Sequence, residues 1–318
     1  MGRLLYITII CVLLCADLSG QDTGYGPSYQ AMLAGNPAIS GAEGDGTLRL
    51  SYLSFYPGKG YNLHSFFVSY DSYISGIHGG AGAWLSNDIQ GGIINDIRGG
   101  LSYSYLLRAG EELYISAGLS AGIFHRTFST GTAILPDMID PFGGVVLPPG
   151  ETLQNRNNTV FDLGAGFLFM YHNYTGGIAM SHLSQPDISE TNDQLKRKLI
   201  IHASQNFTIR DNNSLAIIPV IYCEIQEGNF MASLGSSAGT DKLSVNAILL
   251  TNSNNNLNLQ TGLSAGTGRI VFFYNYRLNL VRGSNLLPIS LQHQTGLAFS
   301  LNHVDKRNLQ KTISLPKM

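Results

Sequence analysis

Histidine and serine side chains are the first candidates for chemistry in this chain of 318 residues, which contains eight histidines. His172 and His182 flank a predicted strand, but no third ligand lies at the spacing of a zinc site. Ser181 and His182 are adjacent, so on a strand their side chains point to opposite faces and cannot act together as nucleophile and base. We therefore expect both histidines to be rim or turn residues. We expect no enzymatic activity and no catalytic, cofactor-binding or metal site.

The motif Gly79-Gly80-Ala81-Gly82 has the glycine content of a phosphate-binding loop. No Lys-Ser or Lys-Thr pair follows it and no helical pattern begins behind it, so it lacks the parts that such a loop needs. Glycine inside a strand commonly marks a bend or a crowded position. We expect this motif to lie in a strand where the sheet curves or where side chains crowd.

Two segments hold the candidates for partner binding. Residues 129–158 form a predicted long connection, and binding residues concentrate on long loops held by a rigid scaffold. The other segment lies in the glycine- and proline-rich stretch at residues 21–46. The alternatives are a solvated loop for the first segment and a simple strand-initiating turn for the second, since Asn-Pro favours turns. Two aspartates are too few to predict a calcium site. The candidate residues are Asn36, Pro37, Ala38, Gly41, Asp137, Asp140 and Pro141.

Strands must position these residues, and residues 257–302 show the strands most clearly. Three successive segments there alternate between apolar residues and a small, uncharged polar set of Asn, Gln, Ser and Gly. Strict alternation places the two sets on opposite faces of a sheet. Successive alternating runs of about ten residues are what a transmembrane β-barrel needs to cross an apolar band of about 25 Å.

The complete chain predicts an all-β fold, a single transmembrane antiparallel β-barrel of about 14 strands at residues 47–304. The count of 14 is even, as in bacterial barrels. Residues 21–46 are a lead-in or a small plug of the lumen, and residues 305–318 are a polar periplasmic tail. The strands are expected at residues 47–56, 62–70, 78–87, 95–108, 112–128, 159–171, 174–182, 197–209, 214–224, 230–238, 242–251, 257–266, 270–279 and 289–302.

The connections between these strands differ in length. Those at residues 210–213 and 228–229 are tight, whereas those at 129–158 and 184–196 are long, and residues 282–287 form a further outer loop. Barrels place short turns on the periplasmic side of the membrane and long loops outside. We therefore expect the tight turns at the periplasmic end.

Composition narrows the class of protein. Only 13% of the residues are charged, about half the share in soluble domains. The mean hydropathy is +0.06, and no apolar run of about 20 residues follows the N-terminus, unlike in a helical membrane protein. The net charge of −2 and the pI of about 6.4 give no indication of nucleic-acid binding.

The first 20 residues have the pattern of a secretory signal peptide. Arg3 supplies the positive charge, residues 4–15 form an apolar region too short to span a membrane, and cleavage is expected before Gln21. Two of the three cysteines leave with this peptide, so Cys223 remains alone and no internal disulfide is possible. The segment predicts export from the cytoplasm.

Several motifs follow one another along the chain in an order that is typical of a known family. Asn36-Pro37-Ala38 and then Gly41 precede an aromatic strand with Leu50-Ser51-Tyr52, which leads to Tyr56-Pro57-Gly58. The segment Phe67-Val68-Ser69-Tyr70-Asp71 and the ending Leu315-Pro316-Lys317-Met318 are also similar to the family. In these motifs the chain resembles the PorP/SprF family. The resemblance covers nearly the whole mature chain and is most specific in the first 140 residues.

This resemblance implies an outer-membrane β-barrel of Bacteroidetes-type bacteria that belongs to the type IX secretion and gliding-motility system. The implied partners are the lipid bilayer, periplasmic ring or lipoprotein components, and a large surface adhesin with a type-B C-terminal domain. The function implied is docking or export of such cargo. The alternative is an outer-membrane porin or solute channel, because a lumen of Gly, Ser, Asn and Gln is compatible with water.

Overall fold

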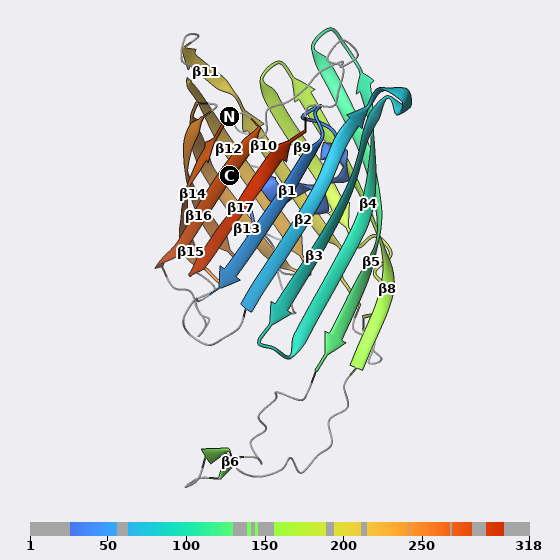
Figure 1. Ribbon diagram of the computed structural model, residues 1–318, viewed down its shortest axis with the longest axis vertical. Helices are drawn as coiled ribbons and strands as arrows, with labels where there is room; N and C mark the ends of the chain where they lie inside the picture. The colour runs from blue at the N-terminus through green and yellow to red at the C-terminus, as the bar shows by residue number, and fades with distance from the viewer. Residues whose placement is uncertain are drawn as a thin grey trace.

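The structure, a computed structural model, is a closed antiparallel barrel of 14 strands (Figure 1). It describes residues 26–55, 63–129, 139–140, 144–145, 156–188, 194–210, 215–240, 242–267, 269–281 and 291–301. The predicted signal peptide, the predicted outer loop at 282–287 and the predicted tail at 305–318 lie outside these residues. No helix among the described residues is long and apolar enough to cross a membrane.

Each wall strand pairs with its neighbours along the chain, β1 pairs with β17, and β10 pairs with β12, so the sheet closes on itself. The predicted all-β barrel and its strand number are therefore confirmed. The wall strands are β1 (Thr47–Phe55), β2 (Leu63–Ile74), β3 (Gly79–Gln90), β4 (Ile94–Arg108), β5 (Leu113–Phe128), β8 (Arg156–Tyr171), β9 (Tyr174–Ser181), β10 (Lys198–Gln205), β12 (Leu215–Gln226), β13 (Asn229–Gly239), β14 (Leu243–Asn252), β15 (Leu257–Gly266), β16 (Ile270–Val281) and β17 (Gln292–Ser300).

Three short strands complete the described sheet structure. β11 (Phe207–Arg210) extends β10 along β12 after a break, and Pro219 of β12 lies opposite this break. Proline has no N–H group to donate to the ladder, which explains why the pairing is interrupted there. β6 (Ile139–Asp140) and β7 (Gly144–Val145) pair with each other within the connection between β5 and β8.

Alternation along each strand separates an apolar outer face from a lumen face. In β14, Leu243, Val245 and Leu249 are exposed on the outside of the barrel, whereas Asn246 and Ile248 are buried inside it. A strand that faces lipid on one side and an enclosed lumen on the other requires this period of two. The exposed apolar residues therefore form the membrane-facing surface.

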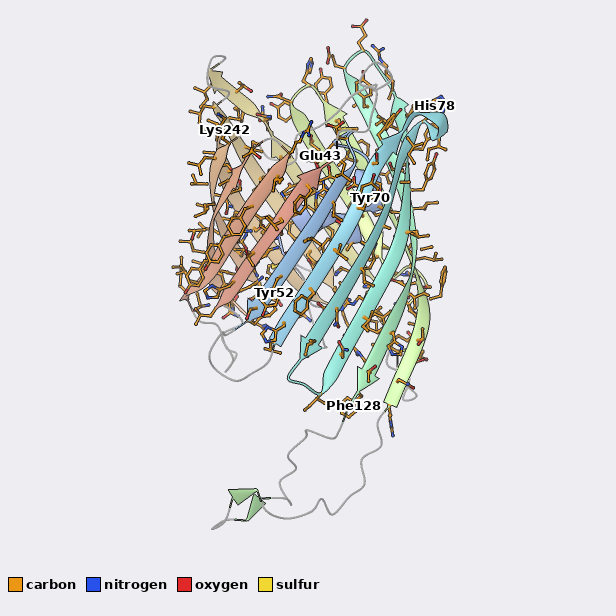
Figure 2. All side chains as sticks on the ribbon, viewed as in Figure 1. Glu43, Tyr52, Tyr70, His78, Phe128 and Lys242 are labelled. Atoms are coloured by element: carbon orange, nitrogen blue, oxygen red, sulfur yellow. The ribbon has the colours of Figure 1, made fainter. Side chains whose placement is uncertain are left out.

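The two ends of the barrel differ in their connections. The β2–β3, β4–β5 and β8–β9 turns lie at one end, together with Gly46 and Leu301, where the Leu301 N–H donates to the Gly46 carbonyl at 2.7 Å. The end of β5 and the start of β8 lie at the opposite end (Figure 1). Since short turns and chain ends lie on the periplasmic side, the first end is periplasmic and the second is outer. Figure 2 shows His78 and Lys242 near the periplasmic end and Phe128 near the outer end.

The expectation that every tight turn is periplasmic is wrong for the β12–β13 turn. Successive turns of an antiparallel barrel alternate between its ends, so this turn shares the outer end with the β5–β8 connection. Glu227 and Gly228 both have positive φ angles, of 48° and 75°. Two positive φ values suit a two-residue hairpin turn. Backbone geometry, not the side of the membrane, therefore sets the length of this turn.

An arginine on the outer face should destabilise the barrel according to its depth in the membrane. Leu101 lies at the middle of β4 and is 69% exposed, while Leu107 lies near the periplasmic end of the same strand. We expect Leu101→Arg to cost about 2–4 kcal/mol of folding free energy and Leu107→Arg about 0–1 kcal/mol. Equilibrium folding into lipid vesicles would measure both, and equal costs would contradict the assignment of this face to lipid.

Candidate functional site

The N-terminal segment of the described chain lies inside the barrel as a plug, defined here as residues 26–46. It contains three short helical turns, η1 (Tyr29–Ala31), α2 (Met32–Gly35) and η2 (Pro37–Ile39). Nearly all of its side chains are buried, and Asn36 and Ala38 are 0% exposed. Of the two alternatives for residues 21–46, the described part takes the form of a lumen plug (Figure 1).

The plug packs against glycines on the lumen face of four wall strands within one side of the barrel, β3 to β9, and we call these glycines the glycine seat. A Cβ atom built on Gly80 of β3 would lie 1.9 Å from the Ser40 carbonyl oxygen, and one on Gly118 of β5 would lie 2.2 Å from the Ala38 nitrogen. Corresponding Cβ atoms on Gly166 of β8 and Gly177 of β9 would lie 2.3 and 2.8 Å from the Asn36 amide. Gly80 and Gly118 thus lie against the plug backbone, whereas Gly166 and Gly177 make room for the Asn36 side chain and, at Gly177, for the His202 ring, whose Nε2 would lie 2.2 Å from a Cβ.

Gly80 belongs to the motif that could have been a phosphate loop. Its position in β3 against Ser40 confirms the expectation of a crowded strand. Among the described residues, no group of three His, Cys, Asp or Glu side chains could hold a metal ion.

Asn36 is the most highly connected residue of the plug. Its Oδ1 accepts from the Ala38 N–H at 3.0 Å, which begins η2, and Pro37 supplies the fixed φ of the next position. Its Nδ2 lies 3.1 Å from Nε2 of His202 in β10 and donates to the Phe167 carbonyl at 3.4 Å. Because Oδ1 faces an N–H donor, Nδ2 must donate to His202, so this Nε2 is the acceptor and the imidazole is neutral.

Serines of the wall satisfy the backbone carbonyls of the plug. Ser104 donates to the Ser40 carbonyl and Ser116 donates to the Ala38 carbonyl, each at 2.8 Å. The Ser40 and Ser102 hydroxyls lie 2.7 Å apart. Backbone groups of the wall are occupied in the barrel ladder, so side chains must supply the partners that the buried plug needs.

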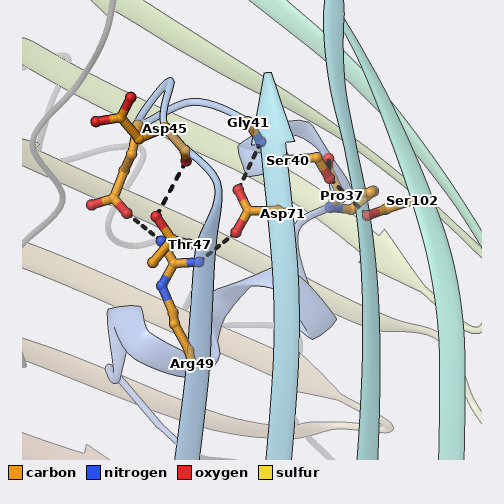
Figure 3. A network of polar contacts seen from close by, with 9 residues as sticks. Pro37, Ser40, Gly41, Asp45, Thr47, Arg49, Asp71 and Ser102 are labelled. Atoms are coloured by element: carbon orange, nitrogen blue, oxygen red, sulfur yellow. Dashed lines mark hydrogen bonds and ion pairs between the residues drawn. The ribbon is translucent and has the colours of Figure 1, made fainter. Parts of the chain in front are cut away.

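Arg49 closes the periplasmic side of the plug (Figure 3). This buried guanidinium on β1 bonds to both Glu43 and Asp71. The other oxygen of Asp71 accepts from the Gly41 N–H at 2.7 Å. Gly41 has a φ of +66°, a conformation that glycine adopts without strain. A charged triad thus ties the last turn of the plug to the first two strands.

An apolar band inside the lumen includes residues of the plug. Its members are buried and come from the plug and from the lumen face of the wall. Burial raises the pKa of the Tyr29 hydroxyl, which keeps the group neutral. The band comprises Tyr29, Met32, Ala38, Ile39, Tyr73, Leu106, Tyr114, Leu168, Met170, Ile200, Val220, Tyr222, Ile248 and Leu250. The alternation of Asn, Gln, Ser and Gly indicated a polar lumen. The structure shows that part of the lumen is apolar.

A cavity of about 80 Å³ lies on the outer side of the plug. Met32 and Gly35 line its floor, and charged side chains line its wall. His182 Nδ1 lies 2.7 Å from Asp162 Oδ2, and Lys198 Nζ lies 3.9 Å from Glu224 Oε1. In the wall of the cavity, Arg98 Nη2 also lies 3.5 Å from Asp88 Oδ2, and in a further pair Arg126 Nε lies 2.7 Å from Asp96 Oδ1. This paired set of charges is polar without a large local excess of either sign.

The structure separates the predicted partner-binding residues into two places. Asn36, Pro37, Ala38 and Gly41 lie together in the plug, where they contact the wall. Asp140 lies in β6, beyond the outer end of β5, and Asp137 and Pro141 lie outside the described residues. Partner binding by either group stays a prediction. The two histidines are rim and turn residues as expected: His172 follows β8 with a φ of 50°, and His182 follows β9 with a φ of 58°.

Sequence reasoning missed the residues that receive the plug. His202 and Arg49 stand at lumen positions of strands, where an isolated ionisable residue in a membrane segment usually marks function. That signal was present in the sequence for Arg49, whose neighbours in the strand are uncharged. The glycine seat had no such signal, because strand glycines occur elsewhere in the chain.

These features define a plugged transmembrane β-barrel. The chain belongs to the PorP/SprF family, described as type IX secretion system membrane protein PorP/SprF, whose family model matches residues 18–302. Family membership and the barrel fold place the protein in the outer membrane. No curated protein matches the sequence.

Solved outer-membrane barrels are similar in fold. The toluene transporter TodX of P. putida has a TM-score of 0.52 at 12% identity, with 90% of this chain and 100% of that chain covered. The outer membrane protein Omp33 of Acinetobacter baumannii has a TM-score of 0.48 at 9% identity, with 82% and 100% covered. At this identity the likeness to TodX supports the barrel architecture alone.

Filling the glycine seat should displace the plug. We expect Gly118→Val to destabilise the chain by about 1–3 kcal/mol through overpacking and to increase hydrogen exchange of the plug amides. The matched control is Gly176→Val on β9, since a Cβ there would lie 3.7 Å from the nearest atom, the His202 carbonyl oxygen. Hydrogen exchange of the plug amides would be measured by mass spectrometry. Equal exchange in the two variants would contradict the proposal that Gly118 makes room for the plug.

Proposed function

We propose that this chain is a non-enzymatic outer-membrane component of the type IX secretion system that docks or helps to export surface cargo. The observation that carries the proposal is the position of the Asn36-Pro37-Ala38 segment. This part of the family signature holds the plug inside the barrel, through the Asn36 amide and the glycine seat. A barrel closed in this way serves as a fixed platform in the membrane.

The two ends of the platform suit different partners. Periplasmic ring or lipoprotein components would contact the short-turn end, where Glu43 is 29% exposed beside the charged triad of the plug. A large adhesin with a type-B C-terminal domain would contact the outer end, from which the β5–β8 connection with Asp140 extends. Assignment of these partners rests on the family and on the polarity of the barrel.

A solute channel is the second candidate. Its support is the polar part of the lumen face near β15 to β17, where Asn258, Gln260 and Gln294 are buried inside the barrel. The apolar band and the plug count against it, since a diffusion pore needs a continuous water-filled path. The prediction that Ser181 and His182 point to opposite faces of a strand is not met, because β9 ends at Ser181 and both residues line the cavity, where His182 Nδ1 lies 2.7 Å from Asp162 Oδ2. The lack of enzymatic activity stays a prediction.

Mild extraction from the native cell would test the proposal. We expect periplasmic lipoproteins or a very large surface protein to co-purify with the wild-type chain, and we expect the purified barrel to be silent in planar bilayers. A chain without residues 28–45 should conduct, which provides the control for an incorporated barrel. A wild-type barrel that purifies alone and conducts steadily would support the channel and contradict the secretion role.

A further inference from the structure

A row of polar side chains lies on the outward face of the barrel near its outer end. It crosses four neighbouring strands, because Tyr276 of β16 pairs with His293 of β17, His293 pairs with Ser54 of β1, and Ser54 pairs with His64 of β2. Residues directly opposite on adjacent strands place their side chains about 5 Å apart. We call these four residues the histidine row. Ser54 is only 6% exposed although its side chain is small and faces outward, so its neighbours cover it.

A tyrosine of the next row fixes each imidazole. The Tyr52 hydroxyl lies 2.6 Å from His64 Nδ1, and the Tyr274 hydroxyl lies 2.7 Å from His293 Nδ1. The Tyr52 and His64 rings also stack, with centroids 5.7 Å apart and planes inclined by 15°. Because Nδ1 of each ring faces a tyrosine hydroxyl, Nε2 is the ring nitrogen that is left to contact another group. When the hydroxyl donates to Nδ1, the ring carries its proton on Nε2, which is then a donor. Two imidazoles, each held by a tyrosine, thus flank Ser54.

An apolar groove of about 420 Å³ begins beside the histidine row and runs toward the middle of the membrane. Tyr52 and Thr295 line its outer end and belong to the strand positions next to His64 and His293. Deeper in the membrane, apolar side chains from five strands line it. They are Leu50, Val68, Leu85, Phe272 and Leu297, while Phe66 lies opposite Tyr52 at the outer end of the groove. Figure 2 shows Tyr52 near the outer end of β1.

We propose that the histidine row and this groove bind one outer-leaflet lipid with a phosphorylated headgroup. The groove would hold an acyl chain, since it lies on the membrane-facing surface and its lining is apolar. The Nε2–H groups of His64 and His293 would donate to the phosphate oxygens, and an ionised acceptor makes such bonds stronger than neutral ones. Aromatic side chains at this depth mark the level of headgroups in a barrel. The polar histidine row beside the apolar groove matches the polar headgroup and apolar acyl chain of a lipid.

Lipid retention measured by native mass spectrometry tests this proposal. The protein, in detergent, is mixed with dioleoyl phosphatidic acid or with dioleoyl glycerol, which has the same acyl chains and no phosphate. We expect retention of one phosphatidic acid molecule, roughly tenfold above the glycerol lipid. The His64→Ala/His293→Ala double variant should reduce this preference roughly tenfold, and Leu297→Trp, which fills the groove, should reduce retention of both lipids.

His125→Ala is the matched control. His125 also lies near the outer end of its strand, β5, and its Nδ1 lies 2.7 Å from the Thr159 hydroxyl, but it is remote from the groove lining. This variant should retain lipid like the wild type. Equal retention of the two lipids, or full retention of phosphatidic acid by the double variant, would overturn the proposal. Complete displacement of the lipid by inorganic phosphate would also overturn it, because it would indicate an anion site without the groove.

Discussion

Hydrogen bonding of a buried backbone is the constraint on which the rest of this structure depends. The plug places carbonyl and N–H groups inside a barrel whose own backbone groups are already paired, and a buried unpaired group would cost about 1–3 kcal/mol. Wall serines donate hydrogen bonds to the carbonyls of Ala38 and Ser40, and Asp71 accepts one from the Gly41 N–H. The glycine seat is the steric counterpart, because these bonds form only when the plug backbone approaches the wall closely.

Two kinds of interaction hold the plug, neutral hydrogen bonds at Asn36 and ion pairs at Arg49 of β1. Asn36 uses a neutral amide to join η2 to His202, at a depth where an unpaired charge would be costly. Arg49 instead sits between two carboxylates near the periplasmic rim. Removing one partner of a buried ion pair is strongly destabilising because the other charge stays buried. The arrangement therefore specifies one position of the plug in the lumen.

The barrel was predictable because its alternation is imposed by the membrane and repeats along every strand. β15 to β17 show this well, since lipid on one face leaves apolar residues such as Leu263 and Phe272 exposed there. The plug was not predictable in the same way. Ile248 and Leu250 are apolar on the lumen face, where they belong to one buried cluster with plug residues that are far away in sequence. Period-two reasoning cannot detect such a contact, and Gly118 looks like any strand glycine until the Ala38 nitrogen is placed beside it.

Disulfide trapping between Ser40→Cys and Ser102→Cys, in a chain that also carries Cys223→Ser, tests the seated plug most directly. The two serine hydroxyls lie 2.7 Å apart, one on the plug and one on β4. The account predicts rapid oxidative cross-linking in intact outer membranes and a matching shift in gel mobility that a reductant reverses. The pair Ser40→Cys and Ser54→Cys should not cross-link, because Ser54 faces outward. Absence of the first cross-link, or equal yields for both pairs, would contradict a plug seated on the inner wall.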